Sequence, residues 1–125
     1  MALVLGLDVS TTATKAILVR PDGSVVGSAS AAYEVDIPQP GWSEQDPTRW
    51  WDAAVVAIGD VLASAGASGS DVAAVGLAGQ MHGAVLLDAG AEPLRPAILW
   101  NDQRTEAECD EIPRRVRPRR LIQVN

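Results

Sequence analysis

One acid and a run of hydroxyls near the start of the chain have the composition of a phosphate-binding turn. Asp8 ends a short apolar run, four of the five residues at 10–14 carry hydroxyls, and Lys15 follows directly. Such a turn can present several N–H groups and hydroxyls to an anion, while the carboxylate holds a hydrated divalent cation through its water shell. A lysine adds a compact positive charge against phosphate. The pattern suits a magnesium nucleotide triphosphate, but an ordinary hydroxyl-rich hairpin turn explains it equally well.

A second polar group follows later in the chain and has the composition of a sugar site. Such a site needs planar donors and acceptors for hydroxyls, and an aromatic or thioether surface for the C–H face. A lone histidine near a strand end is more often structural, and a single tryptophan says even less. The joint neighbourhood favours the sugar site, and its residues are Gln80, Met81, His82, Trp100, Asn101 and Asp102.

The segments around these residues predict a mixed α/β sheet. Apolar runs at 3–7 and 16–19 predict a hairpin, and the turn 20–24, with Pro21 and Gly23, leads into a third strand at 25–33. The run at 72–78 is typical of a buried parallel strand entered through a right-handed crossover. Ligands collect at the carboxyl edge of such strands, so Asp8 and His82 are expected to face one crevice.

The crossover is predicted to be a helix with Asp46 as N-cap, Pro47 at its first position and Gly66 as its stop. Its apolar stripe starts with Trp50 and Trp51, which fit a core that covers the sheet better than a stacking platform for a base.

The later segments predict a hairpin and one more helix. Residues 84–88 and 96–100 are expected to pair as two short strands. Asn101 or Asp102 is expected to cap a polar helix that runs to about Ile112 and is closed by Pro113.

Composition indicates a single soluble domain or part of one. The chain has 125 residues, 47% of them hydrophobic, and no apolar run reaches the roughly 20 residues of a membrane helix. The first residues lack the basic region of a signal peptide, so the mature chain is expected to begin at Met1. With Cys109 as the single cysteine and His82 as the single histidine, neither a disulfide nor a zinc cluster is expected, and a cytoplasmic setting fits best.

The charge is distributed unevenly. The net charge is −6, all 16 acids precede residue 112, and five of the ten basic residues are arginines between positions 114 and 120. Residues 113–125 are therefore expected to be a basic, poorly ordered tail behind a domain at 1–112. A nucleic-acid-binding arm is the alternative to a solvated face, but aromatic residues are missing and two prolines interrupt the run.

Four motifs resemble the FGGY carbohydrate kinase family, in the superfamily of sugar kinases, hexokinase, Hsp70 and actin. They are GLDVSTTATK, WSEQDPTRWW, GLAGQMHGA and RPAILWNDQR, in an order and spacing that run from Leu3 to about Asp110. The block GQMHG at 79–83 resembles the xylulose branch more than the glycerol or gluconate branch. Ser10 departs from the glycine that is usual in the family, so its backbone must avoid or tolerate positive φ.

The resemblance implies a ribonuclease H-like first domain of the actin type, in an intact enzyme that transfers the γ-phosphoryl group of ATP to the C5 hydroxyl of D-xylulose. Asp8 would position the metal nucleotide through water. Thr11, Thr12 and Lys15 would lie near the phosphates, and Met81 and His82 would contact the sugar, with Gln80, Trp100 and Asp102 as further members of the sugar pocket. The partners implied are the sugar and Mg-ATP, without nucleic acid or membrane, and the family pattern allows a homodimer of the full-length enzyme.

The resemblance covers only the opening part of the family's chain. The family's catalytic base and adenosine-binding domain come later, so the chain is expected to be an inactive N-terminal portion of a kinase. A stand-alone binding module, or a kinase for ribulose, gluconate or glycerol, remains the alternative.

Overall fold

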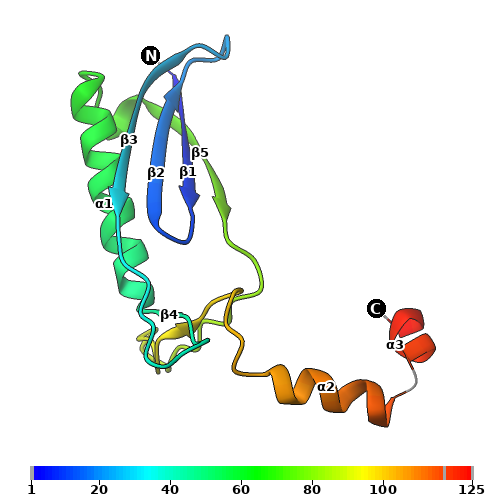
Figure 1. The fold of residues 1–125 in the computed structure, drawn as a ribbon. Coiled ribbons are helices and arrows are strands. Elements are labelled where there is room, and N and C mark those ends of the chain that lie inside the picture. Colours follow the sequence, from blue (N-terminus) through cyan, green and yellow to red (C-terminus); the bar gives the residue numbers. More distant parts are fainter. Residues whose placement is uncertain (1, 117, 125) are drawn as a thin grey trace.

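The computed structural model describes residues 2–116 and 118–124, which form a four-stranded sheet, a two-stranded sheet and a set of helices (Figure 1). The larger sheet has the strand order β3-β2-β1-β5, and the smaller one pairs β4 with β6. The strands are β1 (Leu3–Val9), β2 (Ala13–Val19), β3 (Val25–Ala32), β4 (Glu44–Gln45), β5 (Val72–Gly79) and β6 (Ala97–Ile98). The helices are α1 (Pro47–Ser64), the 3-10 turn η1 (Gly69–Asp71), α2 (Glu106–Arg115) and α3 (Pro118–Val124).

The predicted meander and the parallel strand are confirmed. β1, β2 and β3 pair antiparallel in chain order, and β5 lies parallel to β1 on its other side. The turn between β2 and β3 closes as its residues require, because Gly23 takes a φ of 86° and Arg20 N donates to Ser24 O at 2.9 Å.

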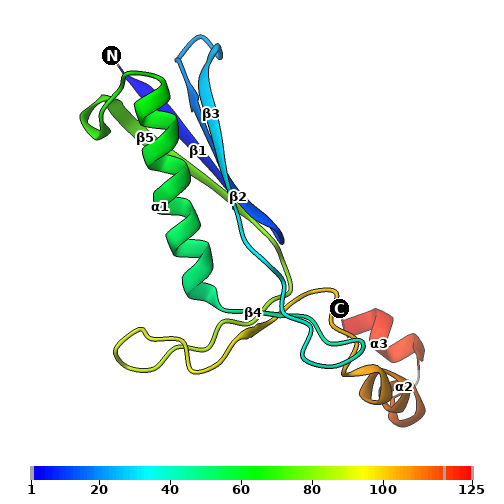
Figure 2. The ribbon, with the colours of Figure 1, turned by 60° about the vertical axis from the view of Figure 1, so that its left-hand side comes forward.

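The helix α1 begins and ends as its capping residues predict. Asp46 is the N-cap and accepts from Thr48 N at 2.9 Å, Pro47 occupies the first turn, and Gly66 follows the last turn with a φ of 60°. α1 lies along one face of the sheet (Figure 2), where its buried residues meet the inward residues of β1 and β2. This core consists of Leu3, Leu5, Ala16, Leu18, Ala57 and Val61.

Two predictions of burial are wrong for this chain. Trp51 is 72% exposed rather than part of the core, and β5 carries the exposed residues Val75 (60%) and Leu77 (76%). The reason is coverage: α1 packs on β2 and β3, and among the described residues no element lies over β5 or over the opposite face of the sheet. Trp50 is half-buried, as a core residue at the edge of α1 would be.

The segment at 84–99 does not form the predicted hairpin of two strands. Isolated bridges join Ala84 to Ile98 and Leu87 to Pro93, while β6 pairs with β4. Ile98 thus pairs with β4 on one edge and bridges to Ala84 on the other, while 86–88 is joined to 92–94 by two backbone bonds, so the two segments touch without a continuous ladder.

The helix predicted after residue 102 begins later, and the residue at its N-cap position makes no side-chain capping bond. α2 starts at Glu106 with Thr105 at the N-cap position, because Asp102 is engaged elsewhere. It also continues through Pro113 to Arg115, where arginines in the last turn complement the helix dipole.

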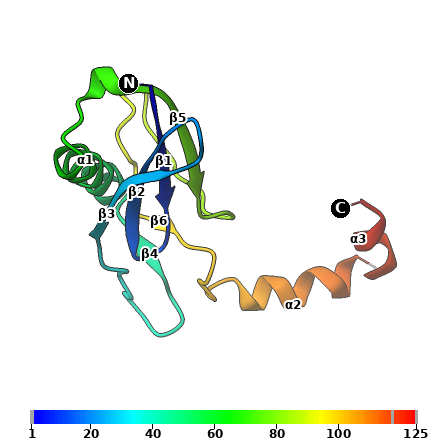
Figure 3. The ribbon, with the colours of Figure 1, turned by 90° about the horizontal axis from the view of Figure 1, so that it is seen from above.

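The described part of the basic tail is helical. α3 starts at Pro118, a position where a missing N–H costs nothing. α2 and α3 project away from the sheet (Figure 3), and poor order of this tail in solution stays a prediction; Arg117 and Asn125 lie outside the described residues. No helix in the described ranges is both long and apolar enough to span a bilayer.

Candidate functional site

The turn between β1 and β2 closes through Ser10. Its N–H and its hydroxyl both donate to Ala13 O, at 3.1 and 2.9 Å. Within the described ranges, positive φ in residues other than glycine occurs at His82 and Ala91, so Ser10 avoids it. The serine thus replaces the family's usual glycine without backbone strain, and its hydroxyl adds a bond that glycine lacks.

The carbonyls of this turn are held by the body of the domain. Tyr33 donates from its hydroxyl to Ser10 O at 2.6 Å and from its N–H to Thr12 O at 3.0 Å. Burial raises the pKa of the Tyr33 hydroxyl, so this hydroxyl stays protonated and can donate. In the part of the chain that the structure describes, the N–H groups of Thr11 and Thr12 donate to no protein acceptor. A turn with fixed carbonyls and free N–H groups can bind an anion.

Gln45 anchors the middle of the turn and was missed by sequence reasoning. It is fully buried, and its Nε2 donates to Thr11 O at 2.8 Å and to Glu34 O at 2.9 Å. Its Oε1 accepts from Trp50 Nε1 at 2.7 Å. The sequence feature that could have indicated this role is the position of Gln45 between Trp42 and Trp50, directly before the N-cap Asp46.

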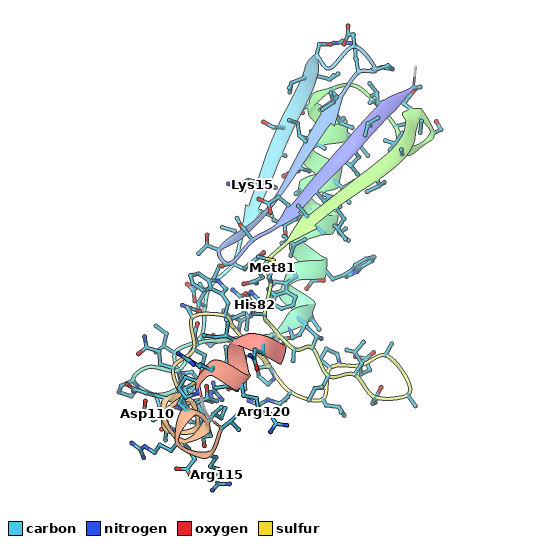
Figure 4. The ribbon with its side chains drawn as sticks, turned by 90° about the vertical axis from the view of Figure 1, so that its right-hand side faces the viewer. Lys15, Met81, His82, Asp110, Arg115 and Arg120 are labelled. Carbon is cyan, nitrogen blue, oxygen red and sulfur yellow. The ribbon has the colours of Figure 1, made fainter. Side chains whose placement is uncertain are left out.

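Asp8 and Lys15 lie on the sheet face opposite α1. They are directly paired in the β1–β2 ladder, and both line an open groove of about 750 Å³ that crosses this face. Figure 4 shows Lys15 on this side of the sheet, with α1 behind. Asp8 is the carboxylate among the groove-lining residues, and Lys15 is exposed there. The groove therefore places one anion and one cation beside the turn.

Gln80 and Trp100 meet the turn at Thr11. Gln80 N donates to Val9 O at 3.2 Å, which continues the β1–β5 pairing past the strand end. The Thr11 hydroxyl donates to Gln80 Oε1 at 3.3 Å and accepts from Trp100 Nε1 at 3.2 Å. Three predicted site residues from distant parts of the chain are thus in contact.

Met81 and His82 follow Gln80 and are exposed just past the end of β5 (Figure 4). Met81 is 72% exposed, and His82 takes a φ of 64°. Left-handed backbone is uncommon outside glycine and clusters at functional sites. No hydrogen bond or ion pair joins His82 to Asp8 among the described residues, so their shared crevice stays a prediction.

Asp102 is held in an ionic cluster instead of being free. Its carboxylate is 2% exposed and accepts from Ser43 N at 2.6 Å and from the Arg104 guanidinium at 2.7 and 2.8 Å. The bonds from Arg104 are the main cause that lowers the pKa of Asp102 below its ordinary value. Its sugar contact stays a prediction; its observed bonds fix the loop after Trp100.

Arg104 extends this cluster to β4. Its Nη1 pairs with Glu44 Oε1 at 2.7 Å, and its guanidinium lies 3.8 Å from the ring centroid of Trp42. Arg95 Nη2 reaches the same Glu44 oxygen at 2.9 Å. The loop that carries Trp100 is therefore tied to the strand that carries Gln45.

Comparisons with known proteins place the whole chain in one family. The model of the FGGY family of carbohydrate kinases, N-terminal domain, matches residues 3–125. The chain is 46% identical over 126 residues to the xylulose kinase of Escherichia coli (strain K12), covering 98% of this chain and 25% of that protein. The xylulose kinase of Klebsiella pneumoniae is 44% identical, with the same coverage.

A solved structure supports the fold. The crystal structure of xylulose kinase from Rhodospirillum rubrum superimposes with a TM-score of 0.86 at 36% identity, covering 96% of this chain and 25% of that chain. The chain thus spans about a quarter of the length of the relatives it matches.

Proposed function

Because the chain belongs to the FGGY family of carbohydrate kinases, we propose that it supplies the phosphate-binding turn and part of the sugar site of a xylulose kinase. The proposed reaction transfers the γ-phosphoryl group of ATP to the C5 hydroxyl of D-xylulose. The contact of Thr11 with Gln80 and Trp100 carries the proposal, since it joins a turn suited to phosphate with residues suited to a sugar.

The nucleotide side consists of Asp8, Thr11, Thr12 and Lys15. Free N–H groups at Thr11 and Thr12, with Lys15 in the adjoining groove, offer donors and charge to phosphate oxygens. Magnesium bound with a nucleotide needs one or two protein carboxylates and keeps several waters, and Asp8 is the carboxylate that the groove offers. The ion, when bound, neutralises charge on the transferred group.

The sugar side consists of Gln80, Met81, His82 and Trp100. Met81 and Trp100 offer exposed apolar surface, with 72% and 59% of their areas open, while Gln80 and His82 offer planar polar groups. Asp102 contributes by fixing the loop behind Trp100.

The remaining parts of the reaction are assigned to segments beyond the matched quarter of the relatives. These parts are the base that accepts the hydroxyl proton and the adenosine site, and without them the 125 residues alone are expected to turn over no sugar. Use of ATP favours a cytoplasmic enzyme, and the homodimer belongs to the same proposal.

The test completes this chain with the remaining segments of the Escherichia coli relative and measures ADP release. D-xylulose should give the highest kcat/KM among xylulose, ribulose, gluconate and glycerol. Asp8→Asn should lower kcat at least a hundredfold, whereas Asp52→Asn on the exposed side of α1 should leave it unchanged. A chimera that prefers another polyol, or stays inert although it is folded, refutes the assignment.

A further inference from the structure

The Thr11 hydroxyl joins two elements that the proposed function assigns to different substrates. It lies in the turn of the nucleotide side, yet its two hydrogen bonds go to Trp100 and Gln80 on the sugar side. We propose that Thr11 is a positioning residue that holds Trp100 and Gln80 for the sugar, and that its hydroxyl does not bind phosphate. This inference rests on the proposed function.

A count of protons and lone pairs supports this assignment. A hydroxyl has one proton to donate. Trp100 Nε1 is a donor only, so Thr11 must accept from it, and the single proton of Thr11 then goes to Gln80 Oε1. Phosphate oxygens are acceptors, so the hydroxyl has no proton left for them. The Thr11 carbonyl is likewise engaged, by Gln45.

The neighbouring Thr12 differs from Thr11 in the exposure of its side chain and in the hydrogen bonds of its hydroxyl. The Thr12 side chain is exposed, and no hydrogen bond of its hydroxyl occurs within the described residues. Two adjacent threonines thus have separable tasks: the Thr12 hydroxyl and both backbone N–H groups face an anion, while the Thr11 side chain holds the sugar side together.

Trp100 and Gln80 both depend on this hydroxyl for their orientation. Trp100 is 59% exposed, so packing alone does not fix its ring. Gln80 Nε2 is buried and has no partner in the part of the chain that the structure describes, so the bond from Thr11 decides which end of the amide faces the turn. Without the hydroxyl, the Trp100 ring and the Gln80 amide lose the hydrogen-bond partner that they share.

The kinetic test uses the chain completed as above, with Thr11→Val, which keeps the shape and removes the hydroxyl. KM for xylulose should rise about tenfold while KM for ATP stays within twofold. Thr11→Ser should restore both values, and the matched variant Thr12→Val should raise KM for ATP instead. Trp100→Phe should raise KM for xylulose, and adding Thr11→Val to it should cost less than the two single effects combined.

A rise in KM for ATP on Thr11→Val, equal to or larger than the rise for xylulose, overturns the inference. That result would mean that the Gln80 amide is turned the other way and that the hydroxyl proton serves phosphate. Full additivity of Thr11→Val and Trp100→Phe overturns it as well.

A spectroscopic measurement on the 125-residue chain separates this inference from the proposed function. The indole N–H resonance that Trp100→Phe removes should shift and exchange faster in Thr11→Val, and return in Thr11→Ser. If the completed enzyme phosphorylates no sugar but this resonance responds, the proposed function fails while the Thr11 contact stands. An unchanged resonance in Thr11→Val would show that Thr11 and Trp100 are not hydrogen-bonded, which overturns the inference.

Discussion

Replacing Gln45 with leucine should destabilise the domain and loosen the phosphate turn together. The substitution keeps the side chain close in size but removes the bonds to Thr11 O, Glu34 O and Trp50 Nε1. Each such bond contributes about 0.5–1.5 kcal/mol net, so three of them give a loss of about 1.5–4.5 kcal/mol. Small domains have only about 5–15 kcal/mol of stability, so this loss is a large fraction.

The assay is urea unfolding of the 125-residue chain at low protein concentration, followed by far-UV circular dichroism. Gln39→Leu is the matched control, because Gln39 is exposed and should change stability by less than about 0.5 kcal/mol. Amide hydrogen exchange at Ser10 and Tyr33, whose N–H groups donate to carbonyls of this turn, should quicken in Gln45→Leu alone. If Gln45→Leu unfolds at the same urea concentration as Gln39→Leu, the buried amide does not anchor the turn and the reasoning is wrong.

Three further predictions concern kinetics, acid and association. In the completed enzyme, His82→Ala should mainly lower kcat/KM for xylulose, which corresponds to a loss of about 1–3 kcal/mol of transition-state stabilisation. Asp8→Ala should instead lower kcat with both substrates saturating. Steady-state kinetics tests both variants, and unchanged xylulose kinetics in His82→Ala would mean that the histidine is structural. Arg104 lowers the pKa of Asp102, so the stability that the carboxylate adds is present above its ordinary pKa of 3.8 and is lost as the pH falls below that value. The melting temperatures of wild type and Asp102→Asn should therefore differ at pH 7 and converge in acid. A difference that stays constant with pH contradicts this. The open apolar surface should make the 125-residue chain self-associate, and Val75→Ser with Leu77→Ser should reduce the mass seen in light scattering; a wild-type monomer with a sharp melt argues against it.

Features set by neighbouring residues could be predicted from the sequence. Asp46 and Pro47 start α1 because a side-chain acceptor and a missing N–H both suit a helix N-terminus. Gly23 permits the turn after β2, because glycine adopts the positive φ of 86° there without strain. In each case the decisive contact lies within a few residues.

Features set by distant contacts could not be predicted. A buried Gln45 has the same sequence signature as an exposed one, since its partners Thr11 and Glu34 are separated from it by 34 and 11 residues. Asp102 was expected to cap a helix or to contact the sugar, because a free carboxylate suits both roles. In the structure, hydrogen bonds from Arg104 and Ser43 already occupy this carboxylate. The burial expected for Trp51 failed because apolar composition does not say which surfaces the rest of a protein covers.

The convergence of the two halves of the candidate site follows from the length of the crossover. α1 has 18 residues and rises about 27 Å, close to the length of about 23 Å that the seven residues of β1 span. The helix therefore returns the chain to the start of the sheet, and β5 runs beside β1 until Gly79 pairs with Val9. Both strands end at one edge, so Gln80 meets the turn at Thr11 although 69 residues separate them. Local rules predicted α1 and β5 separately, and their matched lengths bring the two motifs together.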